Sequence, residues 1–457
     1  LLTSTITSSS TLQIITDFLA KNPTGSRHIQ YDAVSYSGMI LANQASYGKK
    51  ALPSYHFENA KVIVSLNADF LGTWLSPVEF AAQYSKTRKI AGEKPTMSRH
   101  IQFEGALSLT GSNADDRYIH KPSETGVIAL SILSKLGGAV AAPAISDAGL
   151  NKGIDATVAA LKGSMGAGLV VCGSNDVNIQ IIVNAINEAI GANGKTINWA
   201  VTSNYRQGID ADVVKLVEDM NAGNIGALLV YETNPAYTYY DSKKFVAGLK
   251  KVPLTVSFNG TMNETTELCK FSIPSHHWLE SWGDALTTSG QLGLQQPTLD
   301  PVFDTKSTAD VLIELAKKDQ ALAAKYNVVD YRNWYIGKFP GGVPAFTTAL
   351  TKAVLLASPL VAATSRSGTI TASPAPAPAL ASAAGDYYVH VYPSAVLGDG
   401  RGAIGTVSGR YWGMDRDNRW ERVELAFKAI ALADAPRFAS AREGIAASYA
   451  AGKTDEF

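Results

Sequence analysis

A polar stretch between Met97 and Leu136 holds the side chains best suited to chemistry. Its first half has too few apolar residues for a core segment, and it carries Glu104, Ser108, Thr110, Ser112, Asn113, Asp115, Asp116, Arg117, His120 and Lys121. Paired carboxylates can act as general acid and base when both reach one substrate bond. The alternative, which we expect for this stretch and for Asp69, is a set of caps and salt bridges with Arg99, Arg117 and Lys121. A loop of this composition usually binds a ligand or packs on another subunit.

Amide, hydroxyl and carboxylate groups also follow short apolar runs that predict buried strands. Asn67 and Asp69 follow the run Lys61–Leu66, and later strand-end loops carry Ser174, Asn175, Asn234 and Asn259. In an open α/β sheet the carboxyl ends of the strands form the edge where ligands bind. Turns need the same residue types, so these loops alone do not predict a ligand.

Two further motifs contain residue types found in metal sites or phosphate loops, but they lack the spacing or the order of elements that such sites need. His276 and His277 lie near Glu280 and Asp284, but adjacent residues point apart and no third metal ligand follows at helical spacing. We expect these histidines to make structural hydrogen bonds. The stretch Ala189–Thr196 fits a relaxed phosphate-loop pattern, but it leaves a helix and enters a strand. That order is the reverse of the one that points backbone amides at a phosphate, so we reject a phosphate loop.

Cysteine and charge counts exclude several classes of protein. Cys172 and Cys269 are the only cysteines of the 457 residues, too few for a four-thiolate iron-sulfur cluster or a zinc ribbon. We expect two unpaired buried thiols. The 40 basic and 40 acidic residues balance, which argues against a nucleic-acid partner. No apolar run is long enough to span a membrane; the nearest, Ala349–Ala363, is interrupted, and we expect a surface helix there.

The elements that must position these groups alternate along the chain. Strands are predicted at Lys61–Leu66, Ala167–Cys172, Thr196–Val201, Gly226–Tyr231 and Pro253–Phe258. Helices are predicted at residues 11–21, 32–47, 127–136, 175–190 and 307–318, with one more capped by Asp210; Ser174 and Ser307 are the other expected caps. Because parallel neighbours need crossover helices, the last four strands predict one doubly wound parallel sheet in an α/β fold.

Sequence character divides the chain into four parts. Residues 1–360 form the α/β region. Residues 361–385 are rich in Pro, Ala and Ser with almost no charge, which predicts a linker or an exposed loop. Residues 386–403 return to strand character, and we expect them to belong with the α/β region. A tail of different character follows at residues 404–457.

The run from Glu104 to Arg117, E-x-x-x-S-x-T-G-x-x-A-D-D-R, resembles the molybdopterin oxidoreductase family, in which this loop lies near the pterin cofactor. Further matching stretches are VIVSLNADFLG (62–72), ETNP (232–235), HHWLESWGD (276–284) and YYVHVYPSAVLGDGRG (387–402). Within the family, the likeness is strongest to the molybdopterin-oxidoreductase-like domain of the large iron-sulfur subunit of bacterial alternative complex III, a respiratory quinol oxidase. The resemblance covers residues 1–403 and implies a doubly wound fold of molybdopterin oxidoreductase type.

In that subunit the domain holds no molybdenum cofactor, so the resemblance implies an architectural, non-catalytic chain without a cofactor or metal of its own. Its pocket would be vestigial, with candidate residues Asn67, Asp69, Ser108, Thr110, Asp115, Ser174, Asn175, Asn234, His276 and His277. Iron-sulfur clusters and haems are expected in neighbouring domains or subunits. The alternative is an active molybdopterin oxidoreductase, which metal analysis would distinguish.

The implied partners are a multihaem cytochrome subunit, a ferredoxin-like iron-sulfur domain and integral membrane quinol-binding subunits. The implied location is the periplasmic side of the bacterial inner membrane, peripheral within a membrane complex. The sequence opens without a signal peptide, so we expect an interior piece of a longer subunit.

The tail resembles a different enzyme. The stretch GRYWGMDRDNRWERV (409–423) and the closing residues are similar to cofactor-independent phosphoglycerate mutase. In that family the arginines matching Arg410 and Arg416 clamp the substrate's carboxylate and phosphate. The mutase's metal ligands, phosphorylated serine and catalytic lysine region have no match in this sequence. We hypothesise a sequence-assembly artefact at the junction of Ala403 and Ile404; a gene fusion and a mutase fragment are the alternatives.

Overall fold

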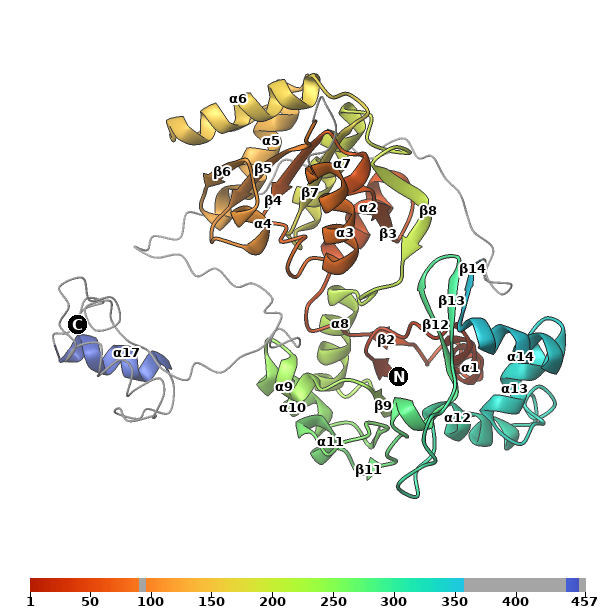
Figure 1. The fold of residues 1–457 in the computed structure, drawn as a ribbon. Helices are drawn as coiled ribbons and strands as arrows, with labels where there is room; N and C mark the ends of the chain where they lie inside the picture. The colour runs from red at the N-terminus through yellow and green to blue at the C-terminus, as the bar shows by residue number, and fades with distance from the viewer. Residues whose placement is uncertain (90–95, 357–440, 452–457) are drawn as a thin grey trace, which may run out of the picture. The chain divides into compact units, whose positions relative to one another are not determined.

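The computed structural model describes residues 1–89, 96–356 and 441–451 (Figure 1). The chain divides into two units, Leu1–Asp399 and Gly400–Phe457. The first unit contains the sheets and cavities, and α17 (Ala441–Ala450) belongs to the second. The expected linker at 361–385, the returning strand at 386–403 and the arginines Arg410 and Arg416 lie outside the described residues.

One parallel sheet has the order β6-β5-β4-β7. Its strands are β4 (Val62–Leu66), β5 (Arg99–Glu104), β6 (Asp116–Ile119) and β7 (Gly168–Cys172). Every residue of β4 and β7 is buried, as their β-branched apolar sequences predict. Figure 1 shows α5 (Thr125–Lys135) and α6 (Ala148–Lys162) on one side of this sheet and α3 (Pro77–Arg88) on the other.

A second parallel sheet has the order β11-β10-β9-β1-β2. It combines two short N-terminal strands, β1 (Leu2–Thr3) and β2 (Ile29–Gln30), with β9 (Ala227–Tyr231), β10 (Leu254–Ser257) and β11 (Phe271–Ser272). The helices α8 (Asp210–Asn221) and α10 (Ser242–Leu249) contribute Val213, Leu216, Val217, Met220 and Phe245 to its separate apolar core. The chain therefore builds two doubly wound layers from interleaved segments.

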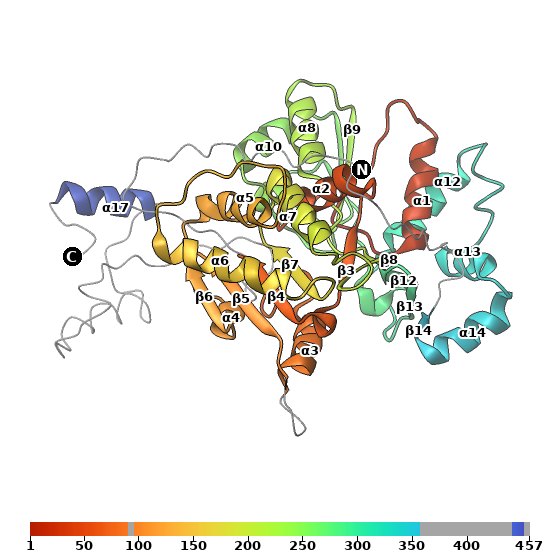
Figure 2. The same cartoon turned by 90° about the horizontal axis from the view of Figure 1, so that it is seen from above.

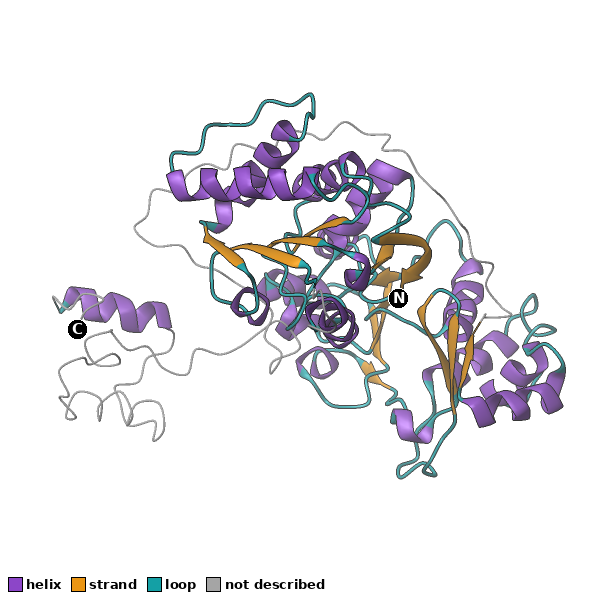
Figure 3. Cartoon of the chain, turned by 45° about the horizontal axis from the view of Figure 1, so that its top comes forward, coloured by secondary structure: helices purple, strands orange, loops and turns teal. Residues whose placement is uncertain are grey.

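The third sheet is antiparallel, with the order β14-β13-β12-β8-β3. Its strands are β3 (Leu52–Tyr55), β8 (Ile197–Ser203), β12 (Gly283–Thr288), β13 (Gln291–Gln295) and β14 (Val354–Leu356). Beside β12 to β14 lies a cluster of helices (Figures 2 and 3), formed by α1 (Ser9–Ala20), α12 (Thr308–Lys317), α13 (Tyr331–Lys338) and α14 (Gly342–Lys352). This cluster has its own aromatic core.

The predicted α/β class with parallel sheets is confirmed, but the prediction of one sheet for the last four strands is wrong. β7 belongs to one parallel sheet, β9 and β10 belong to the other, and β8 pairs antiparallel with β3 and β12. The strand–helix spacing fixes the number of crossovers without fixing which strands become neighbours. The half-buried pattern of β8, unlike fully buried β7, is the sign of an antiparallel strand.

Several element boundaries also differ from prediction. The helix expected at 32–47 begins only at Ser37, as α2 (Ser37–Tyr47), and residues 31–36 form a loop. The cap of α7 (Val177–Ala189) is Asp176 rather than Ser174, because the Asp176 carboxylate accepts the N–H groups of Asn178 and Ile179. Asp210 lies in the first turn of α8, one residue after the cap.

Other boundaries agree or differ in part. Ser307 caps α12 as predicted, accepting the N–H of Asp310. On this helix Leu312 is buried, whereas Leu315 is 41% exposed. Around Ala349–Ala363 the helix α14 ends at Lys352 and β14 follows it.

Among the residues that the structure describes, we find no helix with the length and apolar character needed to cross a bilayer.

Candidate functional site

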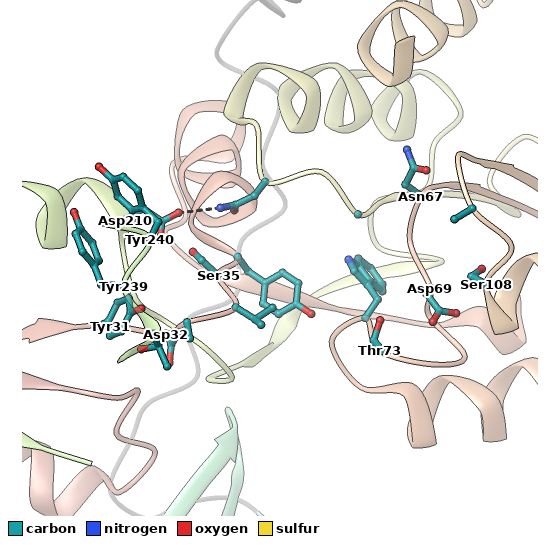
Figure 4. A pocket seen from close by; sticks show the side chains of 18 of the residues that line it. Tyr31, Asp32, Ser35, Asn67, Asp69, Thr73, Ser108, Asp210, Tyr239 and Tyr240 are labelled. Atoms are coloured by element: carbon teal, nitrogen blue, oxygen red, sulfur yellow. Dashed lines mark hydrogen bonds between the residues drawn. The ribbon is translucent and has the colours of Figure 1, made fainter. Parts of the chain in front are cut away.

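A cavity of about 720 Å³ lies at the carboxyl ends of β4, β5 and β7. In this sheet β5 lies on one side of β4 and β7 on the other, so the strand order reverses at β4. Ligands of open α/β sheets bind at such a reversal. Asn67 and Asp69 enter the cavity after β4, Ser108 after β5, and Asn175 after β7, which places four of the predicted residues in one site (Figure 4).

Asn67 is the first residue after β4, and its backbone is left-handed, with φ of 56°. Its side-chain Oδ1 accepts the N–H of Gly105 at 3.2 Å, and its Nδ2 donates to Thr125 Oγ1 at 2.8 Å. The amide therefore ties the end of β4 to the end of β5 and to the start of α5. A non-glycine residue held in this conformation is strained, and such strain concentrates at functional sites.

Two carboxylates at the carboxyl ends of β4 and β5, Asp69 and Glu104, accept hydrogen bonds from the loop of residues 105–112. Asp69 Oδ1 accepts the N–H of Thr110 at 3.0 Å and its hydroxyl at 2.8 Å. Glu104 accepts the Ser108 hydroxyl at 2.6 Å, the Ser108 N–H at 3.3 Å and Arg117 Nε at 2.5 Å. Thr110 thus lies behind the cavity, where it holds Asp69. The expectation of caps and salt bridges is confirmed for these carboxylates.

The loop after β7 is held in the same manner. Asn175 Oδ1 accepts the N–H of Gly38, in the first turn of α2, at 2.7 Å. Its Nδ2 donates to Asp210 Oδ2 at 2.9 Å, which is the dashed line in Figure 4. Ser174 accepts the N–H of Asp176 at 3.1 Å and is not part of the cavity lining.

The opposite side of the cavity is aromatic. Tyr31 and Tyr36 come from the loop after β2, Tyr239 and Tyr240 follow α9 (Pro235–Thr238), and Trp74 follows β4. Tyr31 and Tyr239 meet edge to face with ring centroids 6.2 Å apart, and Tyr239 and Tyr240 are 4.6 Å apart. This wall was not predicted from the sequence, because residues 32–36 were assigned to a helix and short β2 gave no strand signal.

A second cavity of about 510 Å³ lies at the carboxyl ends of β1, β2, β9 and β10. It shares Tyr31–Val34 and Thr238 with the first cavity, and it includes the predicted Asn234. Glu232, the first residue after β9, has φ of 51°, matching the strain of Asn67 after β4. Desolvation raises the pKa of Glu232. Arg206, with φ of 46°, lines the same cavity.

The remaining predicted residues lie outside both cavities. Asp115 pairs with Arg88, at 2.6 Å between Nη1 and Oδ2, and accepts the N–H of His100. Burial acts to raise the pKa of Asp115, but the hydrogen bonds from Arg88 and His100 outweigh it and keep that pKa below the ordinary value. Asp115 therefore stabilises the amino ends of the strands and is not among the residues that line either cavity.

His276 and His277 are also outside the cavities, and their expected role in structural hydrogen bonding is confirmed. His276 Nδ1 lies 2.6 Å from the hydroxyl of Thr305. His277 caps the short helix η3 (Trp278–Glu280), accepting the N–H of Leu279 at 3.3 Å. Within the described ranges no group of three His, Cys, Asp or Glu residues is arranged to hold a metal ion. Both cysteines are unpaired; Cys172 is buried and Cys269 half-buried.

Two parallel sheets with cavities at the carboxyl ends of their strands define a class: α/β proteins of the doubly wound type, in which ligands bind at that edge of the sheet. Residues 90–318, half of the chain, match the molybdopterin oxidoreductase family. The chain belongs to that family. Acetylene hydratase from Pelobacter acetylenicus has a similar fold, with a TM-score of 0.57 and 12% identity over 78% of this chain and 60% of that one.

Residues 382–457 match a second family, the N-terminus of BPG-independent phosphoglycerate mutase. The mutase of Rhodopseudomonas palustris is 67% identical over 54 residues, which are 12% of this chain and 11% of that enzyme. The mutase of Clostridium perfringens strain 13 is 49% identical over 78 residues, 17% and 15% respectively. The chain thus spans less than a sixth of these relatives. The match includes residues 387–402, which we had assigned to the molybdopterin-like part, so that assignment is not supported.

Proposed function

We propose that the α/β part of this chain is a cofactor-free structural domain of a respiratory quinol oxidoreductase of the alternative complex III type. The observation that supports this most is the chemistry of the first cavity. A pterin dinucleotide carries a pyrophosphate, which needs cationic side chains or free backbone N–H groups at strand and helix ends. The described lining includes no cationic side chain.

The charge of the lining is opposite to what a pyrophosphate requires. Asp32, Asp69, Glu104 and Asp210 line the first cavity, and its described lining includes no Lys, Arg or His. Glu104 has Arg117 as its counter-ion, but the other three carboxylates are in no ion pair among the described residues. An anionic ligand would meet uncompensated repulsion there.

Several backbone N–H groups at the strand and helix ends near this cavity are already bound by side chains of the protein. Asp69 accepts Thr110, Glu104 accepts Ser108, and Asp176 accepts Asn178 and Ile179. The lining therefore does not fit the anionic cofactor of the family, because its carboxylates would repel the phosphates. We derive no catalytic step through that cofactor.

A docking role is supported by apolar side chains exposed on one loop region. Trp278, Leu299, Val302 and Phe303, here called the Trp278 patch, are 63%, 50%, 68% and 75% exposed. The N–H of Val302 donates to Glu280 Oε1 at 3.1 Å and that of Leu299 to the carbonyl of Leu279 at 3.1 Å, so these segments lie together. Exposed apolar groups of this size mark interaction surfaces. We propose that partner subunits, among them a multihaem cytochrome and membrane quinol-binding subunits, dock on the periplasmic side through such surfaces.

The test is purification of the native complex through this chain, followed by metal, pterin and partner analysis. We expect background molybdenum, no pterin fluorescence after acid oxidation, and c-type cytochrome and iron-sulfur proteins that co-purify. The double substitution Val302→Ser and Phe303→Ser should release at least one partner, whereas Val78→Ser, at an equally exposed apolar residue of α3, should retain all of them. Stoichiometric molybdenum, or a particle without respiratory partners, would contradict the proposal.

A further inference from the structure

One end of the first cavity combines open carboxylates with aromatic faces. Figure 4 shows Asp32, Asp210, Tyr31, Tyr239 and Tyr240 gathered at this end, with Asn67, Asp69 and Ser108 at the other. Asp210 is exposed, and its carboxylate Oδ2 accepts a hydrogen bond from Asn175 Nδ2. Asp32 is held by the Thr5 hydroxyl at 2.7 Å and the N–H of Gly208 at 2.8 Å. These bonds fix the carboxylates without neutralising them.

Aromatic rings beside carboxylates create a favourable place for a cation that carries apolar groups. The ring of Tyr239 is buried while that of Tyr240 is 75% exposed, so the aromatic wall extends from the interior to the cavity mouth. A cation over such rings gains attraction from their π-electrons in addition to its attraction to the carboxylates. The exposed aromatic face at the mouth would also cover the apolar part of the ligand.

A second observation indicates a ligand in this cavity. Trp74 lines it and is 4% exposed, and its indole Nε1 is buried without a hydrogen-bond partner in the described structure. A buried donor left unpaired destabilises the protein, and an oxygen atom of a bound molecule would offset that cost. The volume of about 720 Å³ is that of a pocket for a small organic molecule.

We propose that the first cavity binds a small organic cation with a guanidinium or primary ammonium group, held between Asp32, Asp210 and the rings of Tyr31, Tyr239 and Tyr240. The ligand also carries an oxygen acceptor within reach of Trp74. This inference goes beyond the proposed structural role. The proposed site selects a cation, whereas a site for a dinucleotide cofactor would have to select an anion.

The experiment is calorimetric titration of the purified full chain with three probes. N-acetyl-argininamide supplies the guanidinium and carbonyl oxygens, N-acetyl-citrullinamide is its neutral counterpart of nearly the same shape, and guanosine diphosphate is the anionic nucleotide. We expect binding of the arginine compound alone, weakened by added salt because charges are screened. Equal binding of the citrulline compound, or binding of guanosine diphosphate without the arginine compound, would overturn the proposal. If the arginine compound does not bind at about 10 mM, the proposal is also overturned, because a dissociation constant above that concentration is too weak for a specific site.

Two substitutions test ligand binding at this site without a change in the fold. Asp210→Asn keeps an oxygen for Asn175 and removes the charge, and Tyr240→Leu removes the π face of an exposed ring. Each should weaken binding about tenfold. Asp212→Asn, two residues along α8 and outside the cavity lining, is the matched control and should bind as the unsubstituted chain does. Unchanged affinity in Asp210→Asn, with unchanged thermal unfolding, would refute the assignment even if the chain proves free of molybdenum.

Discussion

Three polar side chains alternate along one face of β5 in the protein interior. His100 and Gln102 are 0% exposed and Glu104 is 2% exposed. His100 Nε2 lies 3.3 Å from Gln102 Oε1, and Gln102 Nε2 donates to Glu104 Oε2 at 3.1 Å. A satisfied row of this kind fixes strand register and orients Glu104 at the cavity. It also explains why the stretch after Met97, which we expected to be too polar for the core, contains a buried strand.

His100 gives the fold a dependence on pH. Burial lowers the pKa of His100 to about 4 from 6.5. The unfolded chain therefore binds a proton more readily than the folded chain between these values, and stability falls as the pH drops from about 6.5 towards 4. We expect His100 to account for about 2 kcal/mol of lost unfolding free energy at pH 5 relative to pH 7.5.

Urea denaturation of the unsubstituted chain and of His100→Gln at both pH values measures this contribution. The variant should lose less stability between pH 7.5 and pH 5, whereas His56→Gln, at a half-exposed position, should follow the unsubstituted chain. An identical pH dependence in His100→Gln and the unsubstituted chain would show that another group is responsible.

At the scale of elements, the ends of β4 and β7 touch at Gly173. A Cβ atom there would lie 2.3 Å from the carbonyl oxygen of Asn67, and a backbone oxygen cannot move aside cheaply. Gly173→Ala should therefore cost about 2 kcal/mol of unfolding free energy and shift the strained Asn67. Gly226→Ala, where nothing lies within 4 Å of the added atom, is the control and should change stability by about 0.5 kcal/mol or less. Comparable stability of the two variants, measured by urea denaturation, would argue against this close approach.

The helical cluster is joined to β12 by a buried carboxylate. Asp284 is 4% exposed and accepts the hydroxyls of Ser8 at 2.5 Å and Ser9 at 2.7 Å, with a further bond from Ser10, at the start of α1. From the sequence, Asp284 stood out only as a carboxylate near His276 and His277.

Asp284→Ala would leave these hydroxyls unpaired, and we expect a loss of about 3 kcal/mol. Asp284→Asn should cost less because one oxygen remains. Asp300→Ala, at an exposed carboxylate, is the control, and thermal unfolding measures all three. A loss no greater than that of the control would mean that other contacts dock α1.

At the scale of the whole molecule, two family matches share one chain. The mutase match at residues 382–457 carries Arg410 and Arg416, but the chain spans 15% or less of the mutase relatives that we compare. Clamping arginines bind substrate but do not transfer a phosphoryl group, so we expect no mutase activity. A coupled assay with phosphoglycerate and manganese measures this, with a complete mutase as positive control. Turnover above background that is lost in Arg410→Ala would contradict the prediction and favour a genuine fusion.

The local chemistry of the sequence determined much of this protein. Runs such as VIVSL in β4 and LVVC in β7 have enough β-branched, apolar residues to be buried strands in any α/β arrangement. The polar residues that follow them are therefore at strand ends, which is why Asn67, Asp69, Ser108 and Asn175 were placed correctly at one cavity.

Only the tertiary structure decided which strands are neighbours and which side chains face one another. β1 and β2 are two residues long, too short for a periodic signal, yet they complete the second sheet because β1 pairs with β9 and β2 pairs with β1. Tyr31 and Tyr239 are distant in sequence and meet only through that pairing. Long-range backbone pairing depends on the whole chain, and for that reason the aromatic wall and the carboxylates gathered beside it could not be inferred from spacing.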